Sequence, residues 1–205
     1  MHGIMTRARW CGVCAVIVAV LALGLATDAN ADAKLSPAGK FVSRIANASM
    51  DIARRSADRK SAGFRELLAR HGDVGPVALF ALGPYAKSLP SGRRSEYYKL
   101  VVDFTAKVFS SYSKEFEGAV VDVRGETERT GNFIVIDTRV SYGDGRPSRQ
   151  LRWRVSARNG RYKVSDVSVA GFWLTLQLRS EFVSFLRKNN GNFEALFAAL
   201  RRSSR

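Results

Sequence analysis

The stretch Val164–Phe182, VSDVSVAGFWLTLQLRSEF, decides the fold because its periodicity changes in the middle. Before Gly171 apolar residues alternate with small polar ones, as in a strand that is half buried in a sheet. After Gly171 the residues Leu174, Leu178 and Phe182 recur four apart, as on one face of a helix. We therefore predict that a strand passes into a helix at Gly171. The apolar run is too short and too periodic for a membrane anchor.

The strand in this stretch has a problem of phase. Tyr162 and Val164 share one parity, whereas Val167 and Val169 share the other. A β-bulge near Ser165-Asp166 would bring all four apolar side chains to one face of the strand. Without a bulge, both faces of the strand are buried at different heights.

Three further strands are predicted before this one, because the period changes to two after Gly118. Thr130-Gly131-Asn132 and Gly143-Asp144-Gly145 are turns, and Asn159-Gly160 is a strong hairpin signal. Consecutive strands joined by such short turns pair antiparallel, so we expect an antiparallel sheet of about four strands. The three segments are 119–128, 133–142 and 149–157.

Helices are predicted on both sides of the sheet in the sequence. Ser36-Pro37 is a good helix start, because a capping oxygen precedes a proline at the first helical position. Two further helices end near Gly72 and Gly83, and a long one follows Gly92. Asn190-Gly191-Asn192 separates two C-terminal helices. The expected fold is one α+β domain, with the helices packed on one side of the sheet.

The first 31 residues have the pattern of a secretory signal peptide. Arg7 and Arg9 precede an uncharged run, and small residues that suit cleavage follow it. We predict cleavage after Ala31, with Ala33 as the alternative, and a mature domain of residues 32–205. Both cysteines, Cys11 and Cys14, lie in the segment that is removed.

The mature chain is strongly basic. The whole chain has 33 Lys and Arg and 18 Asp and Glu, and residues 1–31 contain only Arg7, Arg9 and Asp28 of these. The mature net charge is therefore +14. For an exported protein this excess favours a membrane surface or an anionic lipid over nucleic acid, although a general solubility role stays open.

The sequence offers little support for catalysis. Its mature part has one histidine, His71, placed at a helix end, and no cluster that would hold a metal or another cofactor. Asp103, Asp137 and Asp166 are candidate general bases, but each is better explained as a helix cap or a partner of a nearby arginine. Basic residues on the hairpin around Asn159-Gly160 either face water or recognise phosphate.

Two blocks of the sequence resemble the toluene-tolerance, or MlaC-like, family of periplasmic lipid-transport components. The segment YKVSDVSVAGFWLTLQLRSEF resembles the family's strand Y-K-V-x-D-V-x-V-x-G and the R-S-x-F that follows it. Leu82, Gly83 and Tyr85 match a second block, I-A-x-x-x-L-G-x-Y-W. The chain departs from the family at Ala86, where the family has Trp, and at Phe172-Trp173, where it has Val and Ser.

The resemblance implies a soluble, non-enzymatic carrier with an NTF2-like cone and an apolar cavity. Such a carrier shuttles phospholipid between an outer-membrane lipoprotein complex and an inner-membrane ABC transporter, with transient contact to the membrane surface. Arg152 and Arg154 are expected to contact the headgroup or the membrane. The residues expected to line the cavity are Leu82, Tyr85, Phe104, Val108, Tyr112, Ile134, Ile136, Trp153, Val155, Val169 and Trp173.

Three alternatives stay open on the sequence alone. A related branch of the family is associated with hopanoids, which are polycyclic lipids. A cone-shaped enzyme would use Asp103 or Asp137 as a base in the same cavity. A periplasmic adaptor would have a filled core and would dock to a membrane complex through its basic face.

Overall fold

The computed structural model describes residues 35–204, and the predicted signal peptide lies outside them. The strands are β1 (Ala119–Thr130), β2 (Phe133–Tyr142), β3 (Arg149–Arg158), β4 (Arg161–Val169) and β5 (Phe172–Trp173). The α-helices are α2 (Pro37–Ala53), α3 (Ala57–His71), α4 (Val74–Leu82), α5 (Arg94–Tyr112), α6 (Leu174–Lys188) and α7 (Phe193–Ser203). Short 3-10 helices lie at Gly83–Ser88 (η2), Ser91–Arg93 (η3) and Ser113–Phe116 (η4).

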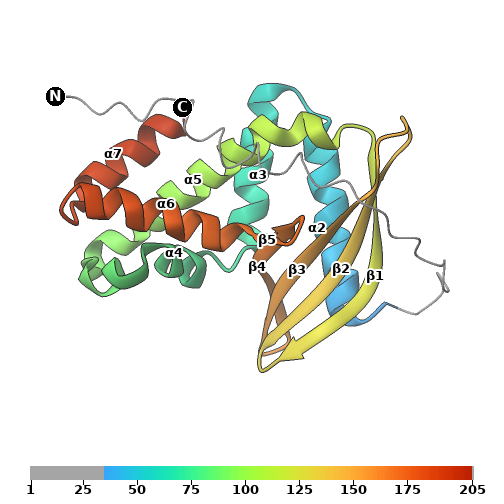
Figure 1. The fold of residues 1–205 in the computed structure, drawn as a ribbon, viewed down its shortest axis with the longest axis horizontal. Coiled ribbons are helices and arrows are strands. Elements are labelled where there is room, and N and C mark those ends of the chain that lie inside the picture. The colour runs from blue at the N-terminus through green and yellow to red at the C-terminus, as the bar shows by residue number, and fades with distance from the viewer. Residues whose placement is uncertain (1–34, 205) are drawn as a thin grey trace. The chain divides into compact units, whose positions relative to one another are not determined.

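The strands form one antiparallel sheet in sequence order, β1-β2-β3-β4-β5, which confirms the predicted α+β class (Figure 1). The prediction of about four strands missed β5, which pairs only Ser168 with Trp173 and Val169 with Phe172. A two-residue strand has no period to detect. It folds back on β4 through Ala170 and Gly171, whose φ angles of 51° and 85° make the tight turn.

The predicted bulge in β4 is confirmed. Arg154 pairs with Asp166 and Val155 pairs with Val164, so Ser165 has no partner in the register. The extra residue brings the apolar side chains on either side of it to the same face, where they pack against one core cluster. These four side chains are Tyr162, Val164, Val167 and Val169.

Helix α2 packs against this face of the sheet, along β1 and β2 (Figure 1). It begins as predicted, since the Ser36 side chain accepts a hydrogen bond from the Gly39 N–H at 3.1 Å and Pro37 follows. We call this side of the sheet the apolar face and the opposite side the polar face. The buried core between α2 and the apolar face consists of Ala38, Phe41, Val42, Ile45, Ala46, Ala119, Ile134, Ile136, Val140, Leu151, Trp153 and Val155.

The remaining helices form a second packed region beside β4. Phe64 of α3 contacts Phe109 of α5, and Tyr97 of α5 stacks on Phe197 of α7 with ring centroids 5.8 Å apart. This region joins the sheet where Gly72 forms a bridge with Val164, next to the N-terminus of α4. Within residues 35–204, none of the helices combines the length and the apolar character that crossing a bilayer requires.

Candidate functional site

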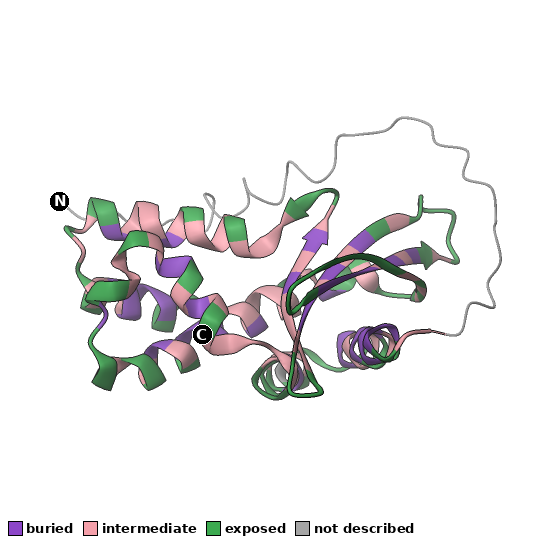
Figure 2. Ribbon diagram, turned by 90° about the horizontal axis from the view of Figure 1, so that it is seen from below, coloured by how far each residue is buried: buried purple, intermediate pink, exposed green. Residues whose placement is uncertain are grey.

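The apolar face of the sheet is larger than its cover. Helix α2 covers β1 and β2, and Leu67 of α3 packs near β4, but one helix is only roughly 10 Å wide with its side chains. Four strands about 4.8 Å apart span more than that. Apolar residues around the buried centre therefore stay only half buried, and such residues are pink in the ribbon of Figure 2. They are Met50, Leu67, Phe116, Val121, Val123, Tyr142, Ala157, Tyr162, Val164, Val167 and Val169.

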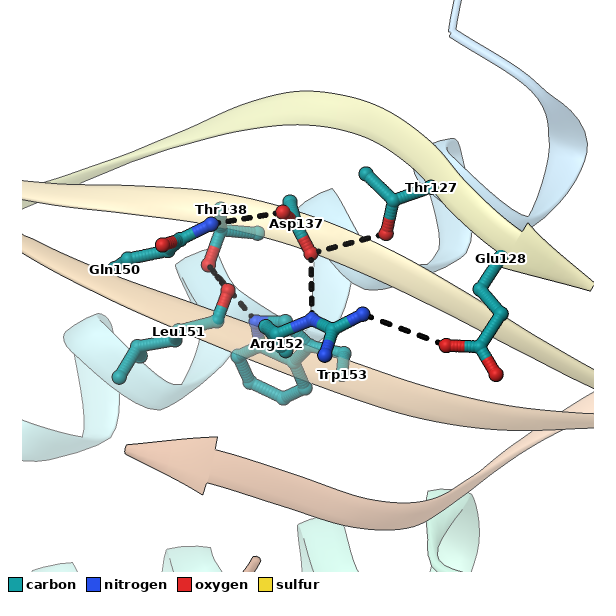
Figure 3. Close-up of polar contacts among 8 residues, drawn as sticks. All are labelled: Thr127, Glu128, Asp137, Thr138, Gln150, Leu151, Arg152 and Trp153. Atoms are coloured by element: carbon teal, nitrogen blue, oxygen red, sulfur yellow. Dashed lines mark hydrogen bonds and ion pairs between the residues drawn. The ribbon is translucent and has the colours of Figure 1, made fainter. Parts of the chain in front are cut away.

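Trp153 lies at the centre of this face and is 8% exposed. Its indole N–H donates to the Thr138 hydroxyl at 3.0 Å, and that hydroxyl donates to the Leu151 carbonyl at 3.3 Å (Figure 3). Thr138 is fully buried, so these two hydrogen bonds satisfy the polar groups at the centre of the face. An apolar ligand can therefore contact the centre of the face without leaving the Trp153 N–H or the Thr138 hydroxyl unpaired.

The polar face carries a different arrangement, centred on Asp137. The Asp137 carboxylate accepts hydrogen bonds from Thr127, from Gln150 at 2.8 Å and from the Arg152 Nε at 3.2 Å (Figure 3). Arg152 also reaches Glu128, at 3.5 Å. The guanidinium predicted to bind a headgroup is thus shared between two carboxylates on the side of the sheet away from α2.

Trp173 also lies on the polar face. Its ring is stacked under the Arg154 guanidinium, 4.1 Å from the ring centroid, and Arg152 lies 5.9 Å away. Such contacts are cation–π interactions. The sequence placed Trp153 and Trp173 in one wall, but the structure separates them onto opposite faces because β5, unlike the predicted helix start, continues the sheet.

Asp166 connects β4 to the start of α6. It accepts hydrogen bonds from the Val167 N–H, the Thr175 N–H at 3.0 Å and the Thr175 hydroxyl at 2.5 Å, and Arg154 lies 3.6 Å away. Thr175 is in the first turn of α6, where backbone N–H groups lack partners within the helix. Burial raises the pKa of Asp166, against the opposing effect of these hydrogen bonds. The residue therefore acts as a helix cap, which the sequence analysis favoured over a base.

The two sequence blocks that carry the family resemblance meet between α4 and α6. Arg179 of α6 donates to the Phe80 carbonyl at 2.7 Å, and its guanidinium lies over the Phe80 ring. Gly83 ends α4 with a φ of 57°, and a Cβ there would lie 2.7 Å from Val183. Glycine is required at this position on both grounds.

The predicted cavity residues fall into three places. Ile134, Ile136, Trp153, Val155 and Val169 lie together on the apolar face. Trp173 is on the polar face. The others belong to the helical region, where Leu82 and Phe104 are buried and Tyr85, Val108 and Tyr112 are half buried.

Several residues of the apolar face were not predicted from the sequence. Phe41, Val42 and Ile45 of α2 face the sheet centre, and Val121 and Val123 of β1 border it. The helical spacing of α2 and the alternation in β1 were visible in the sequence. Neither pattern shows which face of the sheet the helix covers, so these residues could not be assigned to the site.

The two aspartates proposed as catalytic bases are both paired. Burial alone would raise the pKa of Asp103, but hydrogen bonds from Lys99 and Arg65 outweigh it and lower the pKa. Asp103 lines an open hollow of about 310 Å³ with a largely charged lining, together with Arg65, Lys99, Leu100, Arg201 and Ser204. Asp137 lies on the polar face. There its carboxylate is paired with Arg152, and Asp103 lacks the raised pKa that a base at neutral pH needs.

No metal site is visible in the part of the chain that the structure describes. Residues 35–204 contain no group of three or more His, Cys, Asp or Glu side chains placed to hold an ion.

The fold is that of a small α+β protein whose antiparallel sheet has one apolar face that its helices cover only in part. Comparison with known families identifies the family to which the chain belongs. The chain belongs to the MlaC protein family, whose pattern matches residues 38–202. This membership confirms the resemblance found in the sequence and the interpretation of the chain as a non-catalytic lipid carrier of a periplasmic family.

Solved structures agree on the fold. One match is a phospholipid-binding protein from Ralstonia solanacearum, solved in complex with a phospholipid. It has a TM-score of 0.70 and 13% sequence identity, and the match covers 82% of this chain and 97% of that one. At this identity the likeness shows the fold alone. A comparison with curated protein sequences found no match.

Proposed function

We propose that the mature protein carries a phospholipid through the periplasm, with its acyl chains held against the apolar face of the sheet. The lipid passes between an outer-membrane complex and an inner-membrane ABC transporter. Residues 1–31 direct export and are removed after Ala31. The phospholipid bound by the Ralstonia solanacearum protein, which has the same fold, supports this choice of ligand.

The observation that carries the proposal is the incomplete cover of the apolar face. Val121 and Val123 on β1, and Val164, Val167 and Val169 on β4, pack on the core without being fully buried. Apolar side chains that stay half exposed in two rows are unfavourable in water, and an acyl chain laid along them would remove that cost. Each methylene buried in this way contributes about 0.8 kcal/mol.

The same energetics explain why a carrier is needed. A free phospholipid leaves its bilayer only by exposing both acyl chains to water, at about 0.8 kcal/mol per methylene. A protein that replaces the bilayer contacts lowers this barrier without any catalytic group. The paired states of Asp103 and Asp137 agree with such a function.

Native mass spectrometry of the protein purified from the periplasm tests the proposal. We expect about one phospholipid per chain, and an N-terminus at Asp32. A hopanoid in place of phospholipid would identify the polycyclic-lipid branch of the family. Protein that carries no lipid from cells and takes none up from vesicles would overturn the proposal and favour the periplasmic adaptor.

Two neighbouring valines of β1 give a matched pair of variants. Val123 is half buried on the apolar face, whereas Val120 points to the polar face and is 63% exposed. A carboxylate at position 123 would lie against the acyl chains and lose its hydration, so Val123→Asp should reduce bound lipid at least about tenfold. Val120→Asp should bind lipid like the wild type. Equal lipid content in both variants would mean that the ligand lies elsewhere.

A further inference from the structure

A group of basic side chains converges at the margin of the apolar face. Arg70 and His71 end α3, Arg44 comes from α2 and Lys163 comes from β4. The Lys163 ammonium donates to the Arg70 carbonyl, which places it beside the end of α3. We call these four residues the His71 cluster. Three separate elements supply it, across more than ninety residues of sequence.

The acidic residues next to the His71 cluster neutralise only one of its members. Glu66 pairs with Arg70 at 2.8 Å, whereas Asp73 pairs with Arg158, outside the cluster, at 4.0 Å and accepts from Ser165. In the described part of the chain, no ion pair joins Arg44 or Lys163 to a carboxylate. The cluster therefore has an excess of positive charge that the fold itself does not neutralise.

His71 responds to this charge. Burial lowers the pKa of its imidazole, and the charges of Lys163, Arg70 and Arg44 lower it further. A histidine at the C-terminal end of a helix is often an imidazolium that interacts with the negative end of the helix dipole. The lowered pKa of His71 instead favours the neutral ring. A neutral imidazole beside three cations can donate one hydrogen bond to an anion.

The His71 cluster also borders the proposed lipid site. The Phe41 ring, part of the buried core under the sheet, lies 6.1 Å from the His71 ring and 5.9 Å from the Tyr162 ring, between ring centroids. Tyr162 and Val164 belong to the half-buried row of β4. An acyl chain along that row would bring its headgroup phosphate to the cluster.

The arginines first expected to bind the headgroup are less suitable. Arg152 is held by Asp137 and Glu128, and Arg154 is stacked on Trp173 beside Asp166. Both are on the polar face, on the side of the sheet away from Trp153. A phosphate there would compete with existing carboxylates and would be separated from the apolar face by the sheet.

We propose that Arg44, Arg70, His71 and Lys163 form a binding site for a phosphate group. Its source is either the headgroup of the carried phospholipid, which rests on the function proposed above, or free phosphate. Arginine and lysine supply charge-assisted hydrogen bonds, and the α3 end and the rings of Phe41 and Tyr162 hold the site in place.

NMR of the imidazole tests the site directly, because His71 is the only histidine after residue 31. The protein is secreted with its own N-terminal segment, purified from the periplasm, and stripped of lipid with organic solvent and refolding. Inorganic phosphate is then titrated, with sodium chloride at equal ionic strength as the reference. His71→Gln identifies the signal. Phosphate should shift it and raise the pKa of His71, because a bound anion offsets Lys163, Arg70 and Arg44 and favours imidazolium.

Variants separate the site from general charge effects. Arg44→Gln and Lys163→Gln should each weaken phosphate binding about tenfold, the effect of one charge-assisted hydrogen bond. Arg202→Gln removes one exposed positive charge from α7 and should leave the affinity unchanged. Equal weakening by all three variants would show a diffuse charge effect and would overturn the proposal.

Comparison of lipid-bound and lipid-free protein distinguishes the two sources of phosphate. If the site holds the headgroup, phosphate shifts the His71 signal only after lipid is removed. If it holds free phosphate, added phosphate shifts the His71 signal equally in lipid-bound and lipid-free protein. The site then binds phosphate but has no role in lipid binding. A signal that follows only ionic strength in both forms overturns the proposal. A protein that neither carries lipid from cells nor takes it up from vesicles defeats the carrier function but leaves the phosphate titration intact.

Discussion

Two tryptophans on one sheet show how its two faces differ. Trp153 is 8% exposed and is surrounded by the valines and isoleucines of the apolar face, with a single hydrogen bond to Thr138. Trp173, only half buried, lies on the polar face against two arginines. Trp153 stabilises the fold through the burial of its ring, whereas Trp173 does so through cation–π contacts with the two arginines. The difference teaches that residue type alone does not show on which face of the sheet a side chain lies, because both tryptophans were predicted from the sequence to line one cavity.

Replacement of Trp153 should lower the free energy of unfolding more than any of the other substitutions below. Trp153→Ala leaves a cavity at the centre of the apolar face and frees the Thr138 hydroxyl, so we expect a loss of about 3–5 kcal/mol in the free energy of unfolding. Urea denaturation followed by circular dichroism measures it. A loss below about 1 kcal/mol would mean that the indole is not packed as described.

Asp166→Ala should cause the second largest loss in the free energy of unfolding. It removes the acceptor of three hydrogen bonds at the start of α6, two of them from backbone N–H groups. Loss of such a cap costs about 0.5–2 kcal/mol, and the buried donors left unpaired bring the expected total to about 2–3 kcal/mol. Urea denaturation of Thr175→Val provides the control, because that variant loses only the hydroxyl. Equal costs in the two variants would show that the backbone contacts contribute nothing.

The pH dependence of stability offers a second test of Asp166. Because its pKa is raised in the folded protein, folding favours the protonated form, and this contribution to stability is lost as pH rises from about 3.8 through the folded pKa. The contribution of Asp103 to stability has the opposite pH dependence. Its pKa is lowered in the folded protein, so its contribution is lost as pH falls. The stability difference between wild type and Asp166→Asn should therefore fall as pH rises. A flat difference would contradict the raised pKa.

Trp173→Ala should have a smaller effect, about 1–2 kcal/mol, because the ring is only half buried and its cation–π contacts contribute about 0.5–2 kcal/mol. The bound lipid, measured by native mass spectrometry, should not change. Lipid content that rises or falls strongly would place Trp173 in the lipid site after all and would remove the contrast with Trp153.

Arg152→Gln should change stability least. Its ion pairs are partly exposed to solvent, and such pairs contribute about 0–1 kcal/mol. Lipid content should again be unaffected, in contrast to Arg44→Gln if the carried headgroup occupies the His71 cluster. Thermal unfolding of Arg152→Gln and Arg152→Lys measures the effect, and a loss of several kcal/mol would show that Asp137 depends on this guanidinium.

Much of the fold was predictable because its signals are local. The bounds of β2, the end of α3 near Gly72 and the break between the two C-terminal helices at Asn190-Gly191-Asn192 were predicted from alternation and from glycine and asparagine signals. The bulge in β4 followed from a conflict of parity between neighbouring residues. Each of these depends on a few adjacent residues, so tertiary context does not change it.

The parts that could not be predicted depend on distant contacts. Which face α2 covers is decided by packing between α2 and β1, which lie more than sixty residues apart in the sequence. The pairing of Trp173 with Ser168 could not be predicted either. Trp173 directly precedes the apolar residues with helical spacing, so the sequence suggests that it is the first residue of the helix. His71 was placed at its helix end correctly, but its basic neighbours Arg44 and Lys163 come from other elements.

The bridge between Gly72 and Val164 has a consequence for how the chain reaches its native state. The Asp73 N–H donates to the Val164 carbonyl, and Lys163 donates to Arg70, so α3 and α4 attach to a strand that follows more than ninety residues later. Contacts of such long sequence separation form slowly. This attachment of α3 and α4 therefore forms only after β4 has joined the sheet. A chain secreted from its N-terminus would lack it until most of the chain has been translocated.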